Sequence, residues 1–159
     1  MVLKVTTTGL QKAKFDVRQA LKKMVTEATV TIGIHESAGE HEGGISNAAL
    51  GATLHYGTED GRIPARPWLD VGVATGNKEY LQLIADGFED GLDHDLILEQ
   101  VGLVAVGKVQ AYMVELKEPP NAPSTIEKKG DDNPLIDDGV LRQSVTSVVQ
   151  SNRPPEGLD

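Results

Sequence analysis

Only two segments of this chain have the alternation of apolar and polar residues that a half-buried β-strand requires, and they stand far apart. In residues 28–34, Val30, Ile32 and Ile34 alternate with threonine and glycine, and residues 145–149 (VTSVV) repeat the pattern late in the chain. The stretches between them have helical periodicity instead. We therefore expect an α+β fold, in which a small, mainly antiparallel sheet packs against three to four helices joined by long loops.

Four segments carry apolar residues at the three- and four-residue spacing of an amphipathic helix. They are residues 8–26, 47–56, 76–92 and 95–117. Ser46 stands where it can cap the start of the second segment, and Gly57 marks its end. Residues 58–67 and 118–134 contain prolines that disfavour helix, so we expect exposed connections there. Residues 135–143 predict a short helical or turn element.

The chain has the length of one domain and an uneven distribution of charge. Its 159 residues suit a single domain, which we place at residues 1–150, with residues 151–159 as a flexible C-terminal tail. The net charge is −9, but residues 1–30 carry six basic and two acidic side chains, a net of +4, and the rest carries nine and 22, a net of −13. A basic first helix either binds nucleic acid, through residues such as Lys22 and Lys23, or docks on an acidic neighbour.

Several classes of protein are disfavoured by what the sequence lacks. It has no cysteine, so a disulfide-stabilised domain, an enzyme with a thiolate nucleophile and a metal site with cysteine ligands are all excluded. The first residues lack the apolar stretch of a signal peptide. No apolar run approaches the roughly 20 residues of a membrane-spanning helix, so we expect a protein made in a cytoplasm-like space with no membrane partner. The G-x-S-x-G, Walker and G-x-G-x-x-G motifs are absent.

The stretch HESAGEHEGG, residues 35–44, contains the side chains that a metal site would use. The candidate ligands are His35, Glu36, Glu40, His41 and Glu42. A helix-borne zinc pair needs two histidines four residues apart, whereas these are six apart, and three glycines oppose a helix. A solvated acidic loop is the simpler interpretation. A metal-assisted hydrolase that uses His35, Glu36 and His41 is the alternative function.

The segment Ile63-Pro-Ala-Arg-Pro-Trp-Leu69 constrains the backbone more than any other. Pro64 and Pro67 hold the chain extended, and they place Arg66 between two rigid residues. Arg66 is therefore expected to make a fixed ion pair, within the fold or with a neighbour. Trp68, the only tryptophan, either fills the core together with Leu69 or anchors a contact between subunits.

A second unit of this kind follows in residues 134–145 (PLIDDGVLRQSV). Pro134 starts it, and Asp137 or Asp138 can cap a short helix. Leu141 and Arg142 then precede the last predicted strand. An ordinary loop, turn and strand would explain the same residues.

Together the two units resemble the tail-completion and neck proteins of long-tailed bacteriophages, a family that includes the virion-morphogenesis proteins of Mu-like elements. That family pairs an aromatic-Gly-Thr turn and an IPARP-aromatic-Leu segment with a later STI-x-x-KG … PLIDTG-x-L-R-x-S-[IV] segment. This chain has the first pair in residues 56–58 and 63–69, and the later segment in residues 124–130 and 134–145. The resemblance covers roughly residues 30–149, in the family's order and spacing.

The resemblance implies a structural protein, not an enzyme, without a cofactor, that forms a homo-oligomeric ring at the phage head–tail junction. Such a ring joins the portal-side connector to the tail terminator or tail tube, and DNA passes through its lumen without specific binding. The chain is then expected in the virion and, during assembly, in the host cytoplasm. The residues implied in the fold and the subunit contacts are Tyr56, Gly57, Ile63, Pro64, Arg66, Pro67, Trp68, Leu69, Pro134, Leu135, Asp137, Gly139, Leu141 and Arg142.

Overall fold

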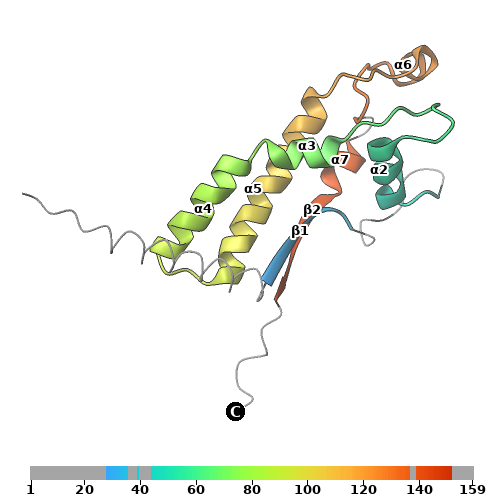
Figure 1. The fold of residues 1–159 in the computed structure, drawn as a ribbon. Helices are drawn as coiled ribbons and strands as arrows, with labels where there is room; N and C mark the ends of the chain where they lie inside the picture. The colour runs from blue at the N-terminus through green and yellow to red at the C-terminus, as the bar shows by residue number, and fades with distance from the viewer. Residues whose placement is uncertain (1–27, 36–38, 40–43, 137–138, 152–159) are drawn as a thin grey trace, which may run out of the picture.

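The computed structural model describes residues 28–35, 39, 44–136 and 139–151, and Figure 1 shows their arrangement. In chain order its elements are β1 (Ala28–Ile34), α2 (Asn47–Tyr56), α3 (Trp68–Ala74), α4 (Asn77–Glu89), α5 (His94–Glu115), α6 (Pro123–Lys129), α7 (Val140–Gln143) and β2 (Val145–Ser151). Helices α4 and α5 lie side by side, with the two strands on the other side of α5, and α2 and α6 lie at the end of the molecule away from α4 (Figure 1).

The two strands form a two-stranded antiparallel sheet that joins segments from opposite ends of the described chain. Val30 pairs with Val149, and Ile34 pairs with Val145. These residues face the interior, whereas Thr31 on the opposite face of the sheet is exposed, as the alternation of side chains along a strand requires. The expected α+β fold with a small antiparallel sheet is confirmed.

Helix α5 is the central element, because the sheet, α3 and α4 all pack on it. Its buried residues are Ile97, Leu98, Val101, Gly102, Ala105, Val109 and Met113. Near the start of α5 the core includes Ala28, and near its end the core includes Trp68, Leu135, Leu141 and Val145. The core therefore brings together residues from the whole length of the described chain.

Helix α5 is also long and apolar enough, by length and composition alone, to cross a membrane. The expectation concerned uninterrupted apolar runs, and in α5 Glu99 and Lys108 interrupt the apolar residues without ending the helix. The core helix of a globular domain passes the same test. In this structure the buried side of α5 is occupied by the sheet, α3 and α4, so its composition is weak evidence for a membrane span.

The described residues hold six helices, rather than the three to four expected, because two short helices were not predicted. Residues 58–67 are a connection as expected, but α3 begins directly after Pro67. Residues 118–134 are not a loop throughout, because α6 begins at Pro123, and proline is well tolerated at the first position of a helix. The helix predicted in residues 8–26 lies outside the described residues.

Candidate functional site

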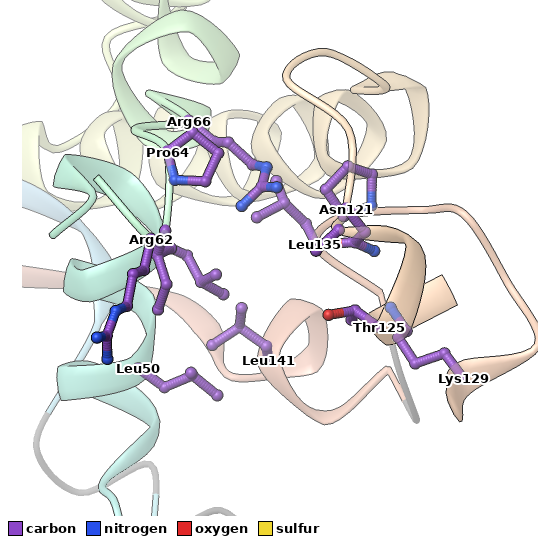
Figure 2. Close-up of a pocket in the computed structure, with 13 residues that line it drawn as sticks. Leu50, Arg62, Pro64, Arg66, Asn121, Thr125, Lys129, Leu135 and Leu141 are labelled. Atoms are coloured by element: carbon purple, nitrogen blue, oxygen red, sulfur yellow. The ribbon is translucent and has the colours of Figure 1, made fainter. Parts of the chain in front are cut away.

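The two motif units of the sequence meet at one groove with a volume of about 300 Å³. The groove lies between α2 and the segment after it on one side and α6 and the segment before α7 on the other. In Figure 2, Leu50 and Arg62 border it on one side and Thr125 and Lys129 on the other. Its lining residues are Leu50, Leu54, Arg62, Ile63, Pro64, Arg66, Asn121, Ala122, Thr125, Lys129, Pro134, Leu135 and Leu141.

Arg66 ties the two sides of this groove together. Its side chain is buried, and its Nε and Nη2 donate hydrogen bonds to the backbone oxygens of Pro119 (2.8 Å) and Pro120 (2.9 Å). Among the described residues the guanidinium thus binds two carbonyls where we expected a carboxylate, and an ion pair with a neighbouring subunit stays a prediction. Burial lowers the pKa of Arg66 from its usual value, yet an arginine stays charged at physiological pH. The groove thus has a fixed cation in its wall.

Trp68 fills the core of the subunit. It is 3% exposed and packs with Met113, Leu135 and Leu141, and its Nε1 donates a hydrogen bond to the backbone oxygen of Gly51 at 3.1 Å. Of the two interpretations of the sequence, the core residue is therefore confirmed and the exposed anchor is not. The half-buried Leu69 packs against the same cluster.

The turn before residues 63–69 is built around Gly57, which has a φ of 75°. A Cβ at Gly57 would lie 2.7 Å from both the nitrogen of Ala65 and the oxygen of Ile63, so only glycine fits here. Thr58 closes the turn, because its backbone nitrogen donates to the Ile63 oxygen at 2.9 Å. Tyr56 is exposed, so of these residues it is the one free to contact another molecule.

The second motif unit contributes apolar residues to the floor of the groove. Pro134, Leu135 and Leu141 are buried, and Gly139, with a φ of 84°, precedes α7. Arg142 is half-buried, and its backbone oxygen accepts a hydrogen bond from Gln110 of α5 at 3.1 Å. The predicted cap at Asp137 or Asp138 falls on residues outside the described part of the chain.

Asn133 is a structural residue that the sequence reasoning missed. It is buried, and its Nδ2 donates to the Val114 oxygen at 2.9 Å while its Oδ1 accepts from the Leu135 nitrogen at 3.1 Å. Its own nitrogen donates to Asp131 Oδ1 at 2.7 Å. The sequence Asp-Asp-Asn-Pro at residues 131–134 is typical of a turn held by Asx side chains, and this signal could have identified it.

Lys129, in the last turn of α6, holds the loop on the far side of the groove. Its Nζ donates to the backbone oxygens of Asn133 (2.8 Å) and Ile136. The hydrogen bond from Asn133, with the nearby charges of Lys117 and Lys129, lowers the pKa of Asp131 below the usual value of 3.8. These contacts fix the loop that carries the second motif unit.

A second, smaller hollow of about 240 Å³ is lined in part by Trp68, Leu69 and His55. His55 is buried there, with its Nε2 at 3.4 Å from Asp70 Oδ2 and its ring edge-on to the indole at a centroid distance of 5.9 Å. The residue before Tyr56 therefore pairs with Asp70 at the start of α3, and it stabilises the segment that places Trp68.

Of the three residues in the metal hypothesis, the structure describes only His35. Glu36 and His41 lie outside the described residues, and within the described ranges no group of three or more histidine, cysteine, aspartate or glutamate side chains is placed to hold a metal ion. The hydrolase alternative therefore stays a hypothesis, and metal analysis of the purified chain would test it.

Comparisons of the chain with protein-family models, with curated proteins and with solved structures find no match. Its function has to be inferred from the motif units and from the groove that they build. The groove is lined by apolar side chains and by three cations, the exposed Arg62 and the carbonyl-bound Arg66 and Lys129. Such a surface suits an acidic segment with apolar side chains.

Proposed function

We propose that this chain is a structural virion protein that forms a homo-oligomeric ring at the head–tail junction of a long-tailed phage. The support is the resemblance of its two motif units to those of tail-completion and neck proteins, together with one structural observation. Arg66 of the first unit, Pro119 before α6 and Leu135 of the second unit belong to one packed assembly around the groove. Motifs that lie about 70 residues apart thus act together in one surface.

We propose further that a neighbouring subunit occupies the groove. In a ring with more than two subunits, one face of each subunit must fit a different face of the next. The charged side chains that line the groove are cationic, whereas residues 31–159 carry a net charge of −13. An acidic surface of the next subunit is therefore its complement, and complementary charge sets the orientation of such a contact.

The acidic body also suits a channel for DNA. Lysine and arginine contacts to phosphate are what hold DNA on a protein, so a lumen lined with carboxylates lets it pass. In this arrangement the ring joins the portal-side connector to the tail terminator or tail tube without binding the genome.

Mass spectrometry and electron microscopy of purified virions test the proposal. Virions from cells that carry the gene are expected to contain the chain in fixed proportion to the tail proteins, with ring density at the neck. If mature virions lack the chain, the proposed function is wrong.

Charge reversal in the groove tests the contact separately. Arg62→Glu is expected to give unjoined heads and tails, because Arg62 is an exposed cation of the groove whose one ion pair among the described residues is with the exposed Asp60, at 3.1 Å. Lys78→Glu is the matched control, since Lys78 is an exposed cation on α4. If both variants assemble equally well, the groove is not the subunit contact, whether or not the chain is in the virion.

A further inference from the structure

One face of the central helix α5 is apolar and exposed. Leu103 is 73% exposed, Leu96 is 42% exposed and Val114 is 43% exposed, and the exposed Gly107 and Ala111 lie among them. We call these five residues the open face of α5. Three large apolar side chains exposed along one side of a helix, with small residues between them, leave a surface that a partner can cover.

The other sides of α5 are already covered. Gly102 faces the sheet, since a Cβ there would lie 2.8 Å from the side chain of Ser147, and α3 approaches at Gly72, where a Cβ would lie 2.8 Å from Val109 Cα. Helix α4 approaches at Gly87, where a Cβ would lie 2.6 Å from Ile97 Cγ1. Figure 1 shows α5 between α4 and the strands. The open face is the remaining side of the helix.

The spacing of the open face is that of a seam between two helices. Leu96, Leu103, Gly107, Ala111 and Val114 follow one another at steps of seven, four, four and three, and the half-buried Gln100 stands at the position between the first two. This spacing keeps one stripe in contact with a second helix along its length. Its partner is therefore expected to be a helix with apolar residues at the same steps.

We propose that residues 8–26 of the same chain form that helix and pack antiparallel on the open face of α5. In this segment Leu10, Val17, Leu21 and Met24 are spaced at steps of seven, four and three, which matches the seam. The segment belongs to residues 1–27, which lie outside the described part of the chain. The proposal is independent of the proposed function.

The position of β1 fixes where the segment must end and in which direction it runs. Ala28, the first residue of β1, is buried against Ile97 and Leu98 in the first turns of α5. A helix that ends two residues before Ala28 and docks on α5 therefore has to end near the start of α5 and run antiparallel to it. Its 19 residues would span about 28 Å as a helix, and the stretch from Leu96 to Val114 spans about 27 Å.

Near the start of α5 the charges of the two surfaces are complementary in this antiparallel register, whereas farther along Lys12 falls opposite Lys108, which Glu79 of α4 already pairs at 2.6 Å. With Met24 near Leu96 and Val17 near Leu103, the cations Lys22 and Lys23 fall toward Glu99, an exposed carboxylate beside the open face. Opposite charges on the flanks of a helix pair favour one orientation.

Lys14, the one basic residue at a seam position, falls opposite Gly107 in the same register. A Cβ built at Gly107 meets no atom within 4 Å, so there is room for the aliphatic stem of this lysine. The basic segment is then a structural element of the subunit and is not a free arm for nucleic acid.

Cross-linking tests the proposal directly, since the chain has no cysteine of its own. The full-length double variant Val17→Cys/Leu103→Cys is treated with a short bismaleimide and analysed under denaturing conditions. The matched control is Val17→Cys/Leu81→Cys, because Leu81 is equally exposed, at 69%, but lies on α4. We expect an internal cross-link at the mass of one chain in the first variant and none in the control.

Each other outcome overturns the proposal. Cross-linked dimers in the first variant would mean that the segment of a neighbouring subunit occupies the open face. Equal cross-linking in both variants, or none in either, would mean that residues 8–26 do not dock there.

A second measurement does not depend on the chosen pair of positions. In full-length single variants, maleimide labelling of Leu103→Cys is expected to be slower than that of Leu81→Cys by on the order of tenfold, because access controls thiol reactivity at equal pKa. Circular dichroism of both variants shows that they are folded. Equal labelling rates would show that the open face is not covered.

Discussion

Replacing Trp68 by alanine distinguishes a core residue from a contact between subunits. Trp68 is 3% exposed and packs within the cluster that includes Met113 and Leu135. Truncation of a buried tryptophan to alanine costs about 3–5 kcal/mol, because transfer free energy is lost and a cavity remains. The change also removes the hydrogen bond from the indole to the Gly51 oxygen at 3.1 Å, which is worth about 0.5–1.5 kcal/mol. We therefore expect the upper half of the range.

In a domain of this length, 1 kcal/mol shifts the Tm by about 2–4 °C, so a loss of about 4–5 kcal/mol should lower the Tm by about 8–20 °C. Calorimetry or circular dichroism is the assay, because the variant lacks the only tryptophan and gives no intrinsic tryptophan fluorescence. Leu81→Ala, at an exposed position on α4, is the control, with a change of about 0.5 kcal/mol or less. A Trp68→Ala variant that keeps its Tm and loses only assembly would refute the assignment to the core.

Three further predictions concern the contacts around the core and the groove. Gly72→Ala should lower the free energy of unfolding by about 1–3 kcal/mol in a denaturant titration, because the new methyl group overlaps the backbone of Val109; unchanged stability would mean that α3 and α5 can separate at no cost. Arg66→Lys should also lower the free energy of unfolding by about 1–3 kcal/mol, since lysine keeps the charge but cannot make both hydrogen bonds to the oxygens of Pro119 and Pro120. Stability equal to the wild type would show that this pair of hydrogen bonds is not needed. The pKa of Asp131 is lowered in the folded state, so its stabilisation is present above pH 3.8 and is lost as the pH falls through the folded pKa. Asp131→Asn should therefore show a smaller loss of stability across this pH range than the wild type in acid titrations followed by circular dichroism, and an identical acid profile would argue against the link to Asn133.

Elements whose limits depend on local chemistry could be predicted from the sequence. Helix α2 begins after Ser46, whose Oγ accepts a hydrogen bond from the Ala49 nitrogen at 3.1 Å, and ends at Gly57. Both limits follow from the conformations that serine and glycine favour. The strands could be predicted because their apolar residues alternate.

The groove could not be predicted, because it depends on contacts between distant residues. Two of its lining residues, Thr125 and Lys129, belong to α6. The prolines around residue 120 favour a loop over a helix, so α6 was not predicted. The partners of Arg66 are backbone oxygens, which every residue possesses and which therefore leave no signature in the sequence. The motif units indicated which segments matter, and the structure shows that they meet.

The pairing of β1 with β2 determines when the subunit can fold. Thr31 donates its hydroxyl to the Val148 oxygen across 117 positions of the chain, and contacts over such distances form late, since a long loop must close first. A chain released from the ribosome before residue 145 has no partner for β1 and leaves the inner side of that strand uncovered. Only translation through β2 produces a finished subunit, so the topology itself excludes prematurely terminated chains from any assembly that needs this fold.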